Sequence, residues 1–363
     1  MPRVLIFKEI ILSTSETFIL AQTGALRRYE ARLAGLEPAE PSLPVHKPLL
    51  LTAEKGLIAD LRAKLYRRIS VAPRFHREIK GFSPDLIHAH FASAGRTAIA
   101  LARLLSVPLV VTLHGADITV RGAAERYKEL AKQVFCFICV SEFIRDRALE
   151  AGLPAEKLIV HYIGIDRSLF TPSPEPPAPS VLFIGRLVEK KGCEYLLRAM
   201  QLVQQTYPTV PVNIIGDGPL RSSLEELATT LNVSCRFLGS LPPAAVRENL
   251  RNTTVFCAPS VTASNGDSEG LPTVLAEAQA CGVPVVTTLH AGIPEIIKEG
   301  ETGFLLEERD HLGLAAAIER LLADEALRQT LRTSAIQRIE NYFDLYKQTL
   351  LLEEIYDRAL EKC

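Results

Sequence analysis

The chain has 363 residues, more than one ordinary core accommodates, and this length predicts two linked domains. A formal net charge of −1 gives no overall positive field, so nucleic acid is not an expected partner. Seven cysteines, scattered mostly through apolar runs, favour buried thiols in a reducing, cytoplasmic compartment. We expect neither an export signal nor a membrane-spanning segment, so any membrane association would be peripheral.

Short apolar runs alternate with helical stretches in the first half of the chain, as in parallel sheets built from βαβ units. We expect strands at residues 4–7, 85–89, 109–113, 134–140 and 158–162. The segment 171–180 then holds five prolines, which makes it too stiff and too poor in backbone donors for a helix or sheet. We interpret this segment as an interdomain linker.

The same alternation restarts after the linker, with strands expected at 181–184, 212–215, 236–238, 255–258 and 285–288. The tail is helical from about residue 312, with a break at 341–344. The sequence therefore predicts an α/β protein with two Rossmann-like domains. The first spans 1–170 and includes a terminal helix at 345–363, and the second spans 181–344.

Two carboxylates, Glu269 and Glu277, have seven residues between them and flank a Gly-Leu-Pro-Thr turn. Pro272 suits the first position of a helix, where unsatisfied backbone N–H groups bind anions. A diphosphate at that helix start would leave one carboxylate for a sugar and the other for a ribose. Two solvated helix charges are the simpler alternative.

A basic turn follows the first strand of the second domain and contains Gly185, Arg186 and Lys191. Arginine through its planar fork and lysine as a point charge can clamp a pyrophosphate. A basic surface turn is the alternative, and we expect the adjacent Lys190 to face solvent. A second strand-to-turn junction contains Gly216, and a third contains Leu238.

These motifs resemble the E-x7-E, G-R-x-x-x-x-K-G and G-x-G-P elements of retaining glycosyltransferases of family 4. Four further segments resemble the corresponding segments of family members that build exopolysaccharides such as colanic acid; they are 13–19, 87–91, 139–143 and 290–295. The resemblance implies a GT-B fold, in which two Rossmann-like domains face a cleft and the last helix crosses back to the first domain. It also implies metal-independent transfer of a hexose from a nucleoside diphosphate sugar, with retention of anomeric configuration.

The resemblance assigns roles to individual residues. Arg186 and Lys191 would contact the donor phosphates, Glu269 the sugar hydroxyls, and His114 the sugar beside its anomeric centre. The remaining residues that we assign to donor binding are Gly185, Gly216, Leu238, Gly270, Leu271, Thr273, Val274 and Glu277.

His114 follows the strand 109–113, at the carboxyl end where open α/β sheets bind ligands. Of His88 and His90, we expect at most one to face that side. We assign Glu16, Thr17, His90 and Asp117 to the acceptor, although Asp117 is equally suited to capping the next turn and Glu16 to a capping box with Ser13. The first strand lacks the glycine pair of many relatives, which leaves the contribution of residues 12–17 to diphosphate binding open, with Ser15 and Thr17 as substitutes.

The resemblance favours a lipid-linked saccharide as the acceptor. A basic stretch with interleaved apolar residues is compatible with contact to anionic lipid, although a solvated helix face has the same pattern; it comprises Arg62, Lys64, Arg67, Arg68 and Arg74 with Leu61, Leu65, Tyr66 and Ile69. Three alternatives stay open: a non-catalytic subunit that binds nucleotide sugars, a GT-B epimerase, and a glycosidase. The presence of His114 argues against the first, and the phosphate-binding motifs argue against the second.

Overall fold

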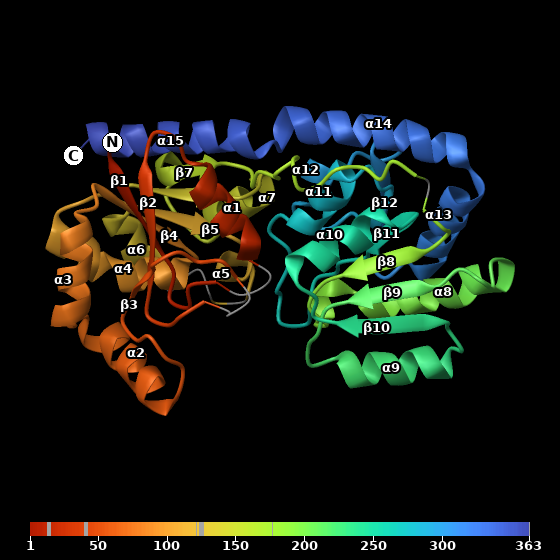
Figure 1. The fold of residues 1–363 in the computed structure, drawn as a ribbon, viewed down its shortest axis with the longest axis horizontal. Helices are drawn as coiled ribbons and strands as arrows, with labels where there is room; N and C mark the ends of the chain where they lie inside the picture. The colour runs from red at the N-terminus through yellow and green to blue at the C-terminus, as the bar shows by residue number, and fades with distance from the viewer. Residues whose placement is uncertain (13–15, 40–42, 121, 123–126, 176, 363) are drawn as a thin grey trace. The chain divides into compact units, whose positions relative to one another are not determined.

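The computed structural model describes residues 1–12, 16–39, 43–120, 122, 127–175 and 177–362. The chain divides into two compact units (Figure 1). Unit 1 comprises Met1–Gly164 together with Leu345–Cys363, and unit 2 comprises Ile165–Asp344. Each unit has its own parallel sheet and its own apolar core.

Unit 1 contains a seven-stranded sheet in which every pairing is parallel, in the order β3-β2-β1-β4-β5-β6-β7. The strand order reverses between β1 and β4, which creates a topological switch point where the carboxyl ends of the strands can bind ligands. The strands are β1 (Arg3–Phe7), β2 (Glu30–Gly35), β3 (Leu49–Leu50), β4 (Leu86–His90), β5 (Leu109–Leu113), β6 (Cys136–Cys139) and β7 (Leu158–Val160).

The helices of unit 1 connect these strands, and the last one arrives from the far end of the sequence. They are α1 (Thr17–Ala25), α2 (Leu57–Ile69), α3 (Pro73–Phe82), α4 (Ala92–Leu105), α5 (Ala116–Thr119), α6 (Lys128–Gln133), α7 (Glu142–Glu150), the short η3 (Ala155–Lys157) and α15 (Leu345–Glu361). In α15, Leu352, Ile355, Tyr356 and Ala359 are buried in the core of unit 1. The predicted return of the terminal helix to the first half of the chain is therefore confirmed.

Tyr356 and Glu353 attach α15 to unit 1 through polar contacts. The Tyr356 hydroxyl lies 2.6 Å from Nδ1 of the buried His88. The carboxylate of Glu353 is fully buried and accepts hydrogen bonds from the backbone N–H groups of Arg27 and Arg28, both at 2.7 Å, and from Nε of Arg28 at 3.0 Å. The terminal helix is thus held by a buried charge as well as by apolar packing.

Unit 2 contains a six-stranded parallel sheet in the order β10-β9-β8-β11-β12-β13, with its switch point between β8 and β11. The strands are β8 (Val181–Ile184), β9 (Val212–Ile215), β10 (Cys235–Gly239), β11 (Val255–Ala258), β12 (Val285–Thr288) and β13 (Gly303–Leu306). The helices are η4 (Glu189–Lys191), α8 (Cys193–Thr206), α9 (Arg221–Thr230), α10 (Pro243–Arg251), α11 (Thr273–Ala280), α12 (Ile293–Ile296), α13 (His311–Ala323) and α14 (Glu325–Tyr342).

The prediction of an α/β fold with two Rossmann-like sheets is confirmed. The described residues of the Pro-rich segment 171–180 lie within unit 2, where the Ser173 carbonyl accepts a hydrogen bond from Arg332 at 3.3 Å. Within the described ranges, no helix is both long and apolar enough to cross a bilayer.

Candidate functional site

The switch point of unit 2 brings the basic turn after β8 against the chain that leaves β11. Gly192 adopts φ +63°, and a Cβ at this position would lie 1.8 Å from the Pro259 carbonyl oxygen. Gly216, at the end of β9, adopts φ +130°, and a Cβ there would lie 1.9 Å from the Gly185 carbonyl oxygen. Both glycines therefore permit backbone approaches that other residues prevent.

Lys191 and Glu269 form an ion pair at this switch point, with 2.8 Å between Nζ and the carboxylate. Burial alone would raise the pKa of the Glu269 carboxyl, but the charges of Lys191 and Lys190 outweigh burial and lower it below its usual value. Glu269 is therefore a buried carboxylate that stays ionised. The structure thus joins two residues that sequence motifs assigned to different parts of one donor.

Arg186 and Lys190 differ in their surroundings. Arg186 is exposed, and its guanidinium makes no hydrogen bond or ion pair to any other described residue. Lys190 was expected to face solvent, and this expectation was wrong: its side chain is 19% exposed and its Nζ lies 3.0 Å from Asp267. Arg186 is therefore the cation that can turn toward a ligand without breaking an existing ion pair.

The turn that carries Glu269 rests on His290, which is buried. Nε2 of His290 accepts a hydrogen bond from the Glu269 backbone N–H at 3.2 Å, so the ring proton lies on Nδ1. That Nδ1 donates to the Glu308 carboxylate at 2.6 Å. Glu308 also accepts hydrogen bonds from the backbone and hydroxyl of Thr262, both at 3.0 Å. The chain Glu308–His290–Glu269 fixes the backbone of the turn.

Sequence reasoning assigned no role to His290 or Glu308. The segment 290–295 was noted only for its resemblance to family members. The contact of His290 with Glu269 joins residues separated by 21 positions, and no local spacing indicates it.

Glu277 lies inside α11, which begins at Thr273, so Pro272 is the residue before the helix and not its first position as predicted. Burial raises the pKa of the Glu277 carboxyl to about 7, against smaller opposing effects of Arg247 and of a hydrogen bond to Thr273. Glu277 therefore changes its charge near neutral pH.

The other donor-binding candidates lie around the same turn or at neighbouring strand ends. Gly270 and Leu271 are buried beside Glu269, whereas Thr273 and Val274 are half-buried in the first turn of α11. Leu238 is 38% exposed in β10, the strand next to β9.

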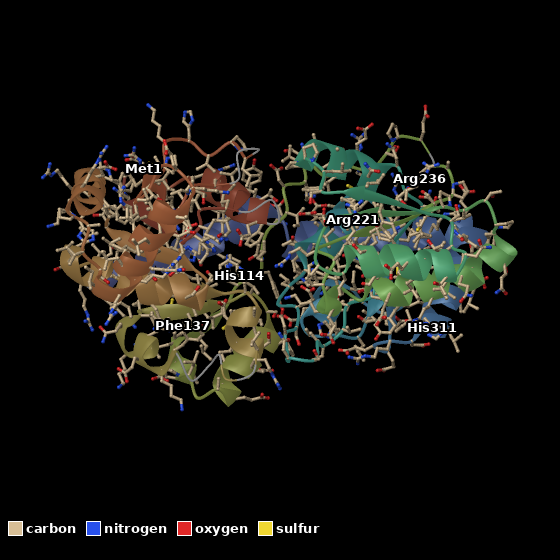
Figure 2. The ribbon with its side chains drawn as sticks, turned by 90° about the horizontal axis from the view of Figure 1, so that it is seen from below. Met1, His114, Phe137, Arg221, Arg236 and His311 are labelled. Carbon is tan, nitrogen blue, oxygen red and sulfur yellow. The ribbon has the colours of Figure 1, made fainter. Side chains whose placement is uncertain are left out.

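Three histidines of unit 1, His88, His90 and His114, form a cluster at the ends of β4 and β5, with His88 and His90 buried and His114 half-buried. His114, labelled in Figure 2, has its Nε2 3.1 Å from Nδ1 of His90. The rings of His90 and His88 lie 4.3 Å apart, because residues two apart in a strand share a face and do not alternate. The His90 ring therefore lies between the rings of His88 and His114. His90 lines the small cavity beside these rings, whereas His88 is bonded to Tyr356 and Thr112 in the core, which agrees with the expectation that at most one of the two faces this side.

Burial keeps these imidazoles neutral. It lowers the pKa of His88 and His90 well below the usual value and that of His114 to about 3, with neighbouring histidines and Lys8 contributing. A small cavity beside the rings is lined by Phe18, Gln22, His90, His114, His161 and Leu352, among others. His90 is only 2% exposed, so it lies beneath His114 and not at the surface as an acceptor contact would require.

The remaining acceptor candidates of unit 1 make internal contacts. Asp117 is 7% exposed and accepts hydrogen bonds from the backbone N–H groups of Ala92, at 3.1 Å, and His114, at 2.9 Å. These hydrogen bonds come from the residue at the start of α4 and from His114, and not from the turn after Asp117 that its alternative role would cap. Glu16 pairs with Lys8 at 2.8 Å, and Thr17 begins α1. Ser13 and Ser15 lie outside the described residues.

Comparison with known proteins agrees with this architecture. Residues 17–169 match the model "Glycosyltransferase Family 4", and residues 169–338 match "Glycosyl transferases group 1". The amylovoran biosynthesis glycosyltransferase AmsK of Erwinia amylovora is 32% identical over 77% of this chain and 71% of its own. The putative colanic acid biosynthesis glycosyltransferase WcaL of Escherichia coli is 34% identical over 67% of this chain and 64% of its own.

Solved structures match the fold over nearly the whole chain. Anabaena Alr3699/HepE in complex with UDP and glucose superposes with a TM-score of 0.80 at 21% identity, covering 98% of this chain and all of that one. Sucrose-phosphate synthase from Thermosynechococcus elongatus gives a TM-score of 0.79 at 19% identity, with full coverage of both chains. The chain spans about two thirds of the length of the curated relatives above. With both halves matched by family models and the GT-B architecture in place, this chain belongs to glycosyltransferase family 4.

Proposed function

We propose that the protein is a retaining glycosyltransferase that transfers a hexose from a nucleoside diphosphate sugar to an acceptor hydroxyl, without a metal ion. The observation that carries this proposal is the buried Lys191–Glu269 ion pair at the switch point of unit 2, with the unpaired Arg186 on the same turn. A site for a glycosyl donor needs cations that bind the diphosphate and an ionised carboxylate that accepts hydrogen bonds from the sugar hydroxyls. This turn supplies both.

In this mechanism, Lys191 and Arg186 stabilise the negative charge that develops on the departing diphosphate. Glu269 accepts hydrogen bonds from the sugar hydroxyls, and Glu277 accepts them from the ribose. The departing phosphate takes the proton of the acceptor hydroxyl on the same face of the sugar, which gives retention. Neutral His114 contacts the sugar without adding positive charge next to an anomeric centre that itself becomes positive.

The closer relatives support an acceptor in exopolysaccharide synthesis, and we infer a lipid-linked saccharide at the cytoplasmic face of a membrane. Because the structure of HepE contains UDP and glucose, UDP-glucose is the first donor to test. His90 and Asp117 enter this proposal as residues that position His114, since both are buried and bonded to it.

The test is a thermal-shift and hydrolysis screen of the purified protein against UDP-, GDP- and ADP-sugars in the presence of EDTA. We expect one nucleotide sugar to stabilise the protein and to be slowly hydrolysed, with both effects weakened in Glu269→Ala and Arg186→Ala. Matched controls are Glu226→Ala and Arg103→Ala, which remove exposed charges elsewhere. Stabilisation without hydrolysis or transfer would support a non-catalytic subunit, and no stabilisation by any donor would refute the donor site.

A further inference from the structure

Helix α2 has one buried face and one exposed face of unusual composition. The buried face is made by Ala59, Ala63 and Tyr66, spaced four and three residues apart. Tyr66 is 1% exposed, packs edge-on against Phe75, and lies 3.1 Å from Nε2 of His76 through its hydroxyl. These contacts hold α2 on α3, and the helix stands out from the sheet of unit 1 in Figure 1.

The opposite face of α2 carries large apolar side chains in contact with solvent. Ile58, Leu61, Leu65 and Ile69 are 71%, 67%, 52% and 50% exposed, and their spacing of three, four and four residues places them in one stripe. Among the described residues, six of the nineteen exposed large apolar side chains fall between 57 and 71. We call this set the α2 face: Leu57, Ile58, Leu61, Leu65, Ile69 and Val71.

Scattered exposed apolar residues are ordinary, but a contiguous exposed group marks an interaction site. Helical geometry places basic side chains on both sides of the stripe, with Arg62 on one side and Lys64 and Arg68 on the other, all exposed. Residues 54–80 contain eight Lys and Arg against three Asp and Glu, in a chain whose net charge is −1. This segment is therefore net positive in a nearly neutral chain, and its cations flank a stripe of exposed apolar side chains.

One basic residue of α2 has a separate task. Arg67 forms ion pairs with Glu9, at 3.2 Å, and Glu37, at 3.6 Å. This pairing attaches α2 to the loops that leave β1 and β2, and it orients the exposed stripe away from unit 1. One side of α2 is thus packed against the rest of unit 1, and the other side is exposed to solvent.

We propose that the α2 face docks on the surface of a bilayer that contains anionic lipids. Its aliphatic side chains would enter the boundary between headgroups and acyl chains, while Arg62, Lys64 and Arg68 contact lipid phosphates. A second copy of the chain fits this surface poorly, because pairing two α2 faces would place the basic residues of one copy against those of the other. A lipid-linked acceptor, as proposed above, explains why the protein would dock there, but docking itself does not depend on the identity of the donor.

The experiment is flotation of the full chain with phosphatidylcholine vesicles, either alone or with about one third phosphatidylglycerol. We expect binding to the anionic vesicles only. Leu61→Ser/Leu65→Ser removes apolar contact and Arg62→Glu/Lys64→Glu/Arg68→Glu reverses the charge, and each should reduce binding at least about tenfold. Leu104→Ser/Leu312→Ser replaces exposed leucines elsewhere and should bind like the original protein.

Thermal melting and nucleotide-sugar binding accompany the flotation measurement. The α2 variants change exposed side chains, so they should melt and bind donor like the original protein. Donor binding without flotation would refute docking and leave the transferase proposal intact. Flotation that depends on α2, without donor binding, would support docking and refute the donor site. Loss of a dimer in Leu61→Ser/Leu65→Ser, with no vesicle binding by the original protein, would assign the face to a second copy and overturn the proposal.

Discussion

Lys191 and Glu269, the two groups that we propose contact the donor, form an ion pair with each other in this structure. Replacing Lys191 by methionine leaves Glu269 buried without its nearest cation. We expect the free energy of unfolding to fall by about 3 kcal/mol and sugar transfer to fall at least about 100-fold. Denaturant unfolding and initial rates measure these effects.

Lys190→Met is the matched control, because it removes a neighbouring cation that pairs with Asp267 and leaves the Lys191–Glu269 pair in place. Its loss of activity should be much smaller. Equal losses in the two variants would show that only the total positive charge of the turn matters.

If Glu277 holds the ribose as proposed, donor binding depends on pH. Its pKa of about 7 means that the carboxylate, the form that we propose accepts hydrogen bonds from the ribose hydroxyls, dominates only above pH 7. We expect the KM for the donor to rise as pH falls from 8 to 6. In Glu277→Gln the KM should be high and nearly independent of pH over this range, and an unchanged pH profile in that variant would contradict the assignment.

The same shift affects stability. Because folding raises the pKa of Glu277, the native state favours the protonated carboxyl. The contribution of this preference to the free energy of unfolding is fully present below the pKa of the unfolded state and is lost as pH rises through about 7. Glu277→Gln removes the buried charge, so at pH 8 the variant should be more stable than the original protein, by about 1–3 kcal/mol. Urea unfolding at pH 5 and pH 8 measures the difference, which should nearly vanish at pH 5.

His290 contacts the Glu269 backbone, so we expect it to affect donor binding only through the turn that it holds. His290→Phe keeps the ring volume and loses the acceptor for the Glu269 N–H, so we expect kcat/KM to fall about tenfold while the fold persists. His290→Gln offers a side-chain acceptor and should recover part of the activity. A purely structural role would instead lower thermal stability in both variants and leave kinetics unchanged.

At the scale of elements, α15 depends on a buried carboxylate. Glu353→Ala leaves the N–H groups of Arg27 and Arg28 without their acceptor, and we expect the free energy of unfolding to fall by about 3 kcal/mol. Glu354→Ala, an exposed neighbour in the same helix, should change stability by less than about 0.5 kcal/mol. Denaturant titration distinguishes the two variants, and similar effects in both would show that Glu353 contributes only helix propensity.

The elements that sequence predicted well are central strands buried on both faces. Residues 109–113, 181–184, 212–215, 255–258 and 285–288 coincide with observed strands because their continuous apolar runs are bounded by turn residues. Three strands, β2, β3 and β13, were missed: β2 contains Glu30 and Arg32, β3 has only two residues, and β13 follows the last strand that the apolar pattern predicts. The E-x7-E and G-R…K-G segments could be found by spacing, but the His290–Glu308 support depends on tertiary contacts.

At the scale of the whole molecule, each unit has a separate core, and this permits the two to respond differently to ligand. If UDP binds to unit 2 alone, saturation at 100 times its Kd should add about 2.7 kcal/mol to the opening free energy of the most protected amides there. We expect slower hydrogen exchange in β8 and β11 and no change in β5. Equal protection of both units would show that they unfold as one.

The division of the chain has a consequence for biosynthesis. Unit 2 is continuous, whereas unit 1 is completed only by the final nineteen residues, Leu345–Cys363. On the ribosome, all of unit 2 emerges while the core of unit 1 still lacks Leu352, Ile355 and Tyr356. We therefore expect the unit whose synthesis begins first to complete its core last.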